Sequence, residues 1–183
     1  MFNRFHNQFK NQKYSSVDYR EKLQKTMKDN AYCIKYFIQC SLEGNENVGH
    51  IEKRMMETQK QLGHWIGYFD HDKKNITQEV ITFIEPIKQA GLVYQYKINE
   101  KKFTTHWYEL ADNLMKILNQ LGDWNIRPFF YKQILLIEAL IKSNIQKNAE
   151  AITYYYGLLI ENNNELSLQI SDGIIKQYKH RFE

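Results

Sequence analysis

The sequence predicts an all-α protein, a single up-and-down bundle of five to six helices. Three observations lead to this prediction. Apolar residues recur at helical spacing along most of the 183-residue chain. Only two prolines and eight glycines are present, which leaves few turn residues for β-hairpins. No segment shows the sustained alternation of apolar and polar residues that is typical of strands.

Six segments carry the helical pattern. The expected helices span residues 17–42, 50–69, 75–93, 104–118, 128–141 and 147–178. Pro86 lies inside the third, and because proline lacks an amide donor we expect a kink there. Pro128 suits the first turn of the fifth helix. The asparagine-rich stretch "ENNNE", residues 161–165, is expected to break the last helix.

Apolar stripes identify the expected buried faces. The first three are Ile34, Phe37, Ile38 and Leu42, then Ile51, Met55, Leu62, Trp65 and Ile66, then Val80, Phe83, Ile84, Ile87, Ala90 and Val93. The fourth is Trp107, Leu110, Ala111, Leu114, Ile117, Leu118 and Leu121. The fifth helix is apolar through "FFYKQILLIEALI". A chain of this length can bury a core of this size without disulfides or metals.

The chain divides into a basic aromatic N-terminal arm, residues 1–26, and a helical bundle domain, residues 27–183. The arm is expected to be partly helical at its end. It holds six basic and two acidic residues, which accounts for the whole net charge of +4. Its candidate binding residues are Arg4, Phe5, Phe9, Lys10 and Lys13, which suit nucleic acid, an acidic protein or a membrane surface. The alternative is a frayed or self-packed terminus.

Several chemistries have no motif in this sequence. It contains no GxSxG, no Walker loop and no GxGxxG, so nucleophile elbows and phosphate cradles are absent. Cys33 and Cys40 stand seven apart, about 10 Å along one helix, beyond disulfide reach. They are expected to be buried thiols, and without a CxxC no thiolate metal site is indicated. We expect no cofactor.

The candidate metal ligands are His64, His106 and Glu109. His106 and Glu109 stand three apart, which places them near one face of a helix. A di-iron bundle needs Glu-x-x-His motifs on two helices, and the chain has none. The apolar stripe instead places Glu109 and Asp112 toward solvent, with Asp112 expected to pair with Lys116. The favoured interpretation is therefore a solvated helix face.

Four stretches, "FIEPIKQAGLVYQY", "HWYELADNLMKIL", "FFYKQILLIEALI" and "ISDGIIKQYKHRF", carry a resemblance over residues 27–182. Together they resemble a family of small uncharacterised helical proteins of clostridia, bacilli and archaea, sometimes mislabelled acetylglutamate kinase. The matching residues include Trp107, Tyr108, Ala111, Asp112, Gly173, Ile174, Gln177 and Phe182. The resemblance implies a compact bundle with inward His, Asn or Asp residues that suit a metal or small polar ligand. The corresponding positions here are Ala31, Thr58, Pro86, Leu110, Gln133 and Leu168, which predicts that this site is lost.

The leading hypothesis is a non-catalytic bundle that acts through protein–protein contact or self-association, as an assembly or accessory component of a virion or other large complex. An enzyme is disfavoured. The second hypothesis is a degenerate or cryptic metal- or small-ligand-binding bundle, and the third is weak nucleic-acid binding through the arm. No apolar run approaches the roughly 20 residues of a membrane span. We therefore expect a soluble cytoplasmic protein, or one carried in a virion.

Overall fold

The computed structural model describes residues 14–70, 72–122 and 124–182. Its helices are α2 (Ser16–Glu43), α3 (Val48–Ile66), α4 (Lys73–Ile84), α5 (Ile87–Tyr96), α6 (Glu100–Leu118), α7 (Arg127–Ile145) and α8 (Ala149–Gln177), followed by the 3₁₀ helix η1 (Lys179–Arg181). No strand occurs in these ranges. If α4 and α5 count as one interrupted helix, the bundle has six, and the all-α prediction is confirmed.

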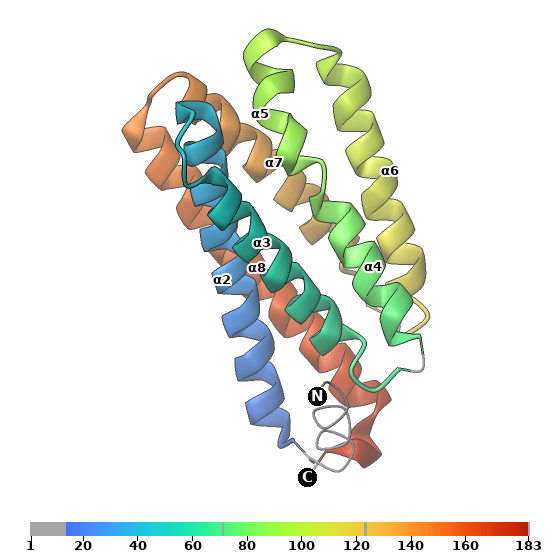
Figure 1. Ribbon diagram of the computed structural model, residues 1–183. Helices are drawn as coiled ribbons and strands as arrows, with labels where there is room; N and C mark the ends of the chain where they lie inside the picture. The colour runs from blue at the N-terminus through green and yellow to red at the C-terminus, as the bar shows by residue number, and fades with distance from the viewer. Residues whose placement is uncertain (1–13, 71, 123, 183) are drawn as a thin grey trace, which may run out of the picture.

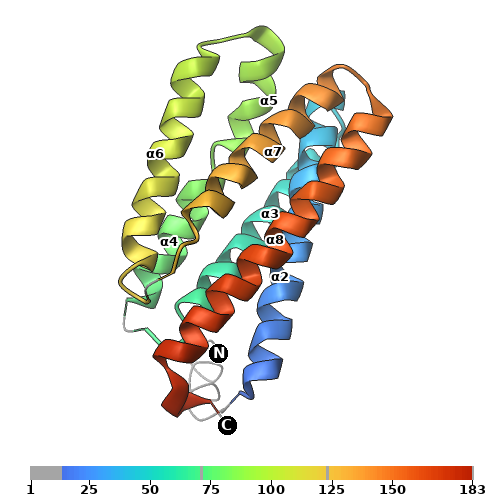
Figure 2. The same ribbon diagram turned by 180° about the vertical axis from the view of Figure 1, so that it is seen from behind.

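Successive helices run in opposite directions, apart from α4 and α5, which run the same way (Figure 1). The view from behind shows the same up-and-down order, with α8 packed beside both α7 and α2 (Figure 2). Helix α3 lies between α2 and α4, and α6 contacts α4 and α7. The start of α2 and the end of α8 therefore lie at one end of the bundle.

Helix α2 starts at Ser16, one residue before the expected helix over 17–42 and within the predicted arm. The Ser15 side chain caps it by accepting a hydrogen bond from the Asp18 amide at 3.0 Å. Tyr19 and Leu23 are fully buried in the core, so the helical end of the predicted arm is continuous with the bundle. The helix ends at Gly44, whose φ of 65° is a left-handed conformation that glycine adopts without a steric penalty.

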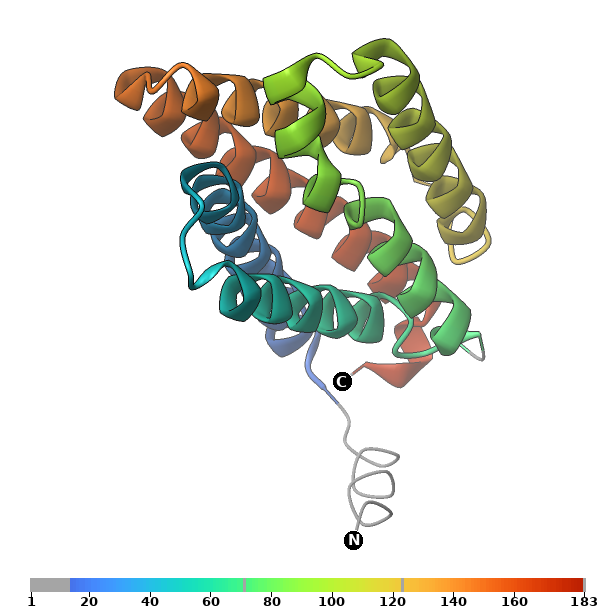
Figure 3. The same cartoon turned by 45° about the horizontal axis from the view of Figure 1, so that its top comes forward.

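Pro86 does more than kink the third predicted helix, because the structure shows two separate helices there (Figure 3). Proline has no N–H and cannot continue the ladder of α4. Carbonyls in the last turn of a helix lack intrahelical partners. One of them, the Phe83 carbonyl, accepts a hydrogen bond from Nε1 of the fully buried Trp107 at 2.8 Å.

The expected break at "ENNNE" is wrong, because α8 runs without interruption from Ala149 to Gln177. Asn162 and Asn163 face inward and are buried. Their side-chain amides donate to backbone carbonyls of neighbouring helices, Asn162 to Phe129 at 3.0 Å and Asn163 to Met27 at 3.1 Å. These contacts offset the weak helix propensity of asparagine, which arises from competing local hydrogen bonds.

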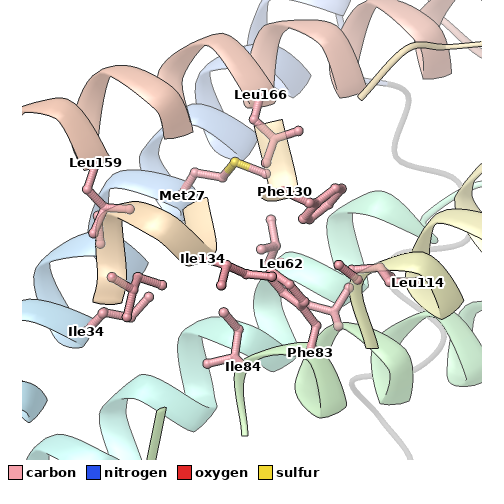
Figure 4. Packing of buried hydrophobic residues seen from close by; sticks show 14 of the residues in the cluster. Met27, Ile34, Leu62, Phe83, Ile84, Leu114, Phe130, Ile134, Leu159 and Leu166 are labelled. Carbon is pink, nitrogen blue, oxygen red and sulfur yellow. The ribbon is translucent and has the colours of Figure 1, made fainter. Parts of the chain in front are cut away.

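The apolar core runs through the middle of the bundle and draws on every helix from α2 to α8. Figure 4 shows part of it, where side chains such as Met27, Phe83 and Leu166 pack together. Each fully buried Leu, Ile, Phe or Met side chain contributes about 1.5–3 kcal/mol relative to an exposed one. Close packing also demands small residues. A Cβ at Gly173 of α8 would overlap the ring of Trp124, whereas a Cβ at Gly157 would meet nothing within 4 Å.

Replacing these two glycines of α8 tests the packing directly. Gly173→Ala should lower the free energy of unfolding by about 1–3 kcal/mol, because the added methyl group overpacks against Trp124. Gly157→Ala is the matched control and should raise stability by about 0.5–1 kcal/mol through helix propensity. Urea unfolding followed by circular dichroism measures both. Equal effects of the two substitutions would contradict this packing.

Candidate functional site

A small cavity inside the bundle is lined by amide side chains from four helices. They are Asn30 of α2, Gln59 of α3, Gln133 of α7 and Asn163 of α8, each at most 4 % exposed. The rest of the wall is apolar. The cavity measures about 10 Å³, roughly what a single water needs. Polar side chains from four helices therefore converge inside the bundle.

Hydrogen bonds among these side chains leave two acceptors without partners. Gln59 Nε2 donates to Asn30 Oδ1, and the Thr58 hydroxyl lies 3.3 Å from the same oxygen. Asn163 Nδ2 donates to the Met27 carbonyl. Gln59 Oε1 and Asn163 Oδ1 are buried and accept no hydrogen bond from the described residues. A sequence signal existed, because Asn163 continues the inward stripe of α8 with Leu159 and Leu166.

A second buried polar group joins α5, α6 and α7. The hydroxyls of Tyr94 and Thr104 both donate to Glu138 Oε1, the latter at 2.6 Å, and they lie 2.9 Å from each other. Lys142 Nζ lies 4.8 Å from the centre of the Tyr94 ring. Burial and the bond to Glu138 raise the pKa of Tyr94, so its hydroxyl stays protonated and acts as a donor. This arrangement holds a buried carboxylate, which would otherwise be costly to desolvate.

His64 belongs to an aromatic cluster at the end of the bundle where α2 starts and α8 ends. The cluster consists of Tyr14, Tyr19, His64, Trp65, Tyr68, Phe69, Tyr178 and Phe182. The His64 ring makes edge contacts with Trp65 and Tyr68, and its Nε2 lies 3.5 Å from Lys73 Nζ. Burial and the positive charge of Lys73 lower the pKa of His64 to about 4. The ring is therefore neutral at pH 7.

His106 and Glu109 lie on the surface of α6, as the solvated-face interpretation predicted. Their side chains are 61 % and 67 % exposed, and His106 Nδ1 lies 3.4 Å from Glu109 Oε2. Asp112 does not pair with Lys116. It accepts a hydrogen bond from the Tyr131 hydroxyl at 2.8 Å and lies 3.4 Å from Arg127 Nε, because α7 packs beside α6 at this point.

The structure does not unite the three candidate metal ligands. His64 lies among aromatic rings beside Lys73, whereas His106 and Glu109 pair with each other on α6. Across the described ranges, no three His, Cys, Asp or Glu side chains are placed to hold a metal ion. A cationic neighbour and a neutral interior both disfavour a cation at His64. The metal hypothesis therefore has no ligand set among the described residues.

Other predicted residues have different outcomes. Cys33 is buried as expected, Cys40 is half-buried, and both are free thiols. Arg4, Phe5, Phe9, Lys10 and Lys13 of the arm lie outside the described residues, so their binding role stays a prediction.

The positions that the family resemblance singled out do not converge on one site. Thr58 and Gln133 are buried and lie in or beside the amide-lined cavity, and Ala31 is buried nearby on α2. Leu168, by contrast, is exposed on α8. The amide-lined cavity therefore differs from the site that the resemblance implied.

Comparison with known proteins gives no match, since no family model, curated protein or solved structure is significantly similar to the chain. The resemblance noted in the sequence therefore stays a prediction. Within residues 14–70, 72–122 and 124–182, no helix is both long and apolar enough to cross a bilayer.

Tyr94→Phe tests the buried polar group around Glu138. Removing the hydroxyl takes away one of two donors to a buried carboxylate and should lower the free energy of unfolding by about 1.5–3 kcal/mol. Tyr96→Phe, two residues along on the exposed face of α5, is the matched control and should change stability by less than about 0.5 kcal/mol. Chemical denaturation measures both, and an unchanged Tyr94→Phe protein would contradict the arrangement.

His64 should make stability fall as the pH drops from 6.5 toward 4. Its folded-state pKa lies below the ordinary value, so the unfolded chain binds the proton more readily and protonation favours unfolding. The melting temperature of the His64→Gln variant, measured by calorimetry, should vary less with pH across this range than that of the wild type. His106→Gln, which alters an exposed ring, is the control and should retain the wild-type profile. A wild-type slope in His64→Gln would contradict the burial of this ring.

Proposed function

We propose that the protein acts through protein–protein contact, as an assembly or accessory component rather than as an enzyme. The observation that supports this most is a set of large apolar side chains exposed at the end of α5. Leu92, Tyr96 and Ile98 are 58 %, 63 % and 54 % exposed, and we name these three residues the α5 patch. Isolated exposed apolar residues are ordinary on protein surfaces, but a cluster of them marks an interaction site.

The backbone explains why these side chains cluster. Leu92 and Tyr96 are four apart and share one face of α5, opposite the buried Ala90 and Tyr94. Lys97 follows with a φ of 53°, and the Ile98 amide donates to the Val93 carbonyl at 3.0 Å. This turn brings Ile98 back beside the end of the helix. The tertiary fold leaves all three side chains uncovered.

The surroundings of the α5 patch suit a protein contact with a polar rim. Lys97 lies between Tyr96 and Ile98, Glu100, Lys101 and Lys102 follow shortly after, and none of the four is buried. An apolar centre surrounded by charged residues is the usual anatomy of an interface. Tyrosine is also enriched at the energetic centres of such contacts.

The interior supports the same conclusion. The amide-lined cavity has room for about one water, whereas small-molecule sites measure roughly 300–1,000 Å³. The surface hollow around His106 is larger, about 700 Å³, but it is open to solvent and is lined by side chains of the α5–α6 turn and the first turns of α6. Neither place combines a nucleophile, a base and an orienting group in the way that catalysis requires.

Sedimentation velocity over a range of concentrations tests the contact as self-association. The wild-type protein should associate, and the triple variant Leu92→Ser, Tyr96→Ser and Ile98→Ser should stay monomeric, with its dissociation constant raised at least about tenfold. The double variant Leu135→Ser and Leu168→Ser removes exposed apolar side chains of α7 and α8 and serves as the matched control. It should associate like the wild type. A wild-type protein that is monomeric at every concentration would overturn this form of the proposal.

A further inference from the structure

We infer that Gln59 and Asn163 together bind one buried water molecule at the centre of the bundle. The water donates one hydrogen to Gln59 Oε1 and the other to Asn163 Oδ1. Its site is the amide-lined cavity between α2, α3, α7 and α8, which is independent of the contact surface proposed above. The chemical class of the ligand is a single small, neutral hydrogen-bond donor.

Both oxygens are held in place and lack a donor among the described residues. Asn163 Nδ2 is committed to the Met27 carbonyl at 3.1 Å, which orients the Oδ1 of the same amide. Gln59 Nε2 is committed to Asn30 Oδ1, which orients Gln59 Oε1. Both side chains are at least 99 % buried, so bulk solvent does not reach them. Leaving a buried acceptor unsatisfied costs about 1–3 kcal/mol.

The cavity also offers the space that a water needs. Gln59 and Asn163 line the same cavity, whose volume of about 10 Å³ matches one water and excludes an organic ligand. Buried waters make about three hydrogen bonds. Gln133 also lines the cavity and brings an amide that can donate to the water oxygen. Polar walls of this kind distinguish the cavity from an apolar void, which stays dry.

The chemistry of the lining favours water over a cation. No carboxylate, thiol or imidazole lines the cavity. A cation would bring an uncompensated charge into surroundings formed otherwise by apolar side chains such as Leu62, Phe83 and Leu114, which are among those drawn in Figure 4. Burying an unpaired charge is far more costly than burying a hydrogen-bonded neutral molecule. The neutral amides therefore favour water.

Crystal structures at high resolution of the wild type and of two matched variants test this inference. Asn163→Leu removes one acceptor from the cavity. Asn162→Leu is the control, because Asn162 is the next residue of α8, is equally buried and also donates to a backbone carbonyl, yet does not line the cavity. The wild type and Asn162→Leu should show a density peak about 2.7–3.2 Å from both Gln59 Oε1 and the Asn163 side chain. Asn163→Leu should lose the peak.

If Asn163→Leu does not fold, Gln59→Met removes the other acceptor at nearly constant volume and should lose the same peak. An empty cavity in the wild type would overturn the inference. So would a peak with six or more oxygen ligands at about 2.3–2.6 Å, since that geometry belongs to a metal cation rather than to water.

Discussion

The hydrogen bond from the Trp107 indole to the Phe83 carbonyl is the constraint on which the second half of the bundle depends. Pro86 ends the ladder of α4 and leaves a carbonyl in its last turn without a helical partner. An unpaired buried carbonyl would be costly, and buried backbone groups are therefore almost always paired. The donor comes instead from α6, where the largest fully buried side chain of the core packs against the break. This hydrogen bond therefore fixes α6 beside the break between α4 and α5.

The interruption at Pro86 has two consequences for α5. It brings Tyr94 against α7, where its hydroxyl and that of Thr104 satisfy the buried Glu138 carboxylate. It also leaves the opposite face of the helix uncovered, so that Leu92 and Tyr96 project into solvent. A continuous helix through Pro86 would change both faces together. The buried carboxylate and the α5 patch are therefore two results of one backbone interruption.

Apolar periodicity was sufficient to predict the all-α class and the approximate extent of most helices, because it reports directly which side of each helix is buried. Apolar periodicity gave wrong predictions where a contact between helices decides the local conformation or the hydrogen-bond partner. "ENNNE" stays helical because carbonyls at Met27 and Phe129 receive the two inward amides, and their proximity is not visible in the local pattern. Asp112 likewise accepts a hydrogen bond from Tyr131 of the neighbouring helix instead of pairing with Lys116 on its own helix. The amide-lined cavity combines residues up to 133 positions apart, so the inward position of Asn163 in its helical stripe indicates one wall but not the partners from the other helices.

The buried amides give the bundle a specificity that its apolar core lacks. Leucine, isoleucine and phenylalanine pack acceptably in several registers as long as volume is conserved. An inward asparagine does not, because a shift of one turn would separate its amide from the carbonyl that it binds and leave two buried polar groups unpaired. The hydrogen bond of Asn163 to the Met27 carbonyl fixes the register of α8 relative to α2 in this way. The hydrogen bond of Gln59 to Asn30 fixes the register of α3 relative to α2. A water bound to the free oxygens of the same two side chains would join these pairings into one network. The polar centre then acts less as a source of net stability than as a means of selecting one arrangement of helices over its near alternatives.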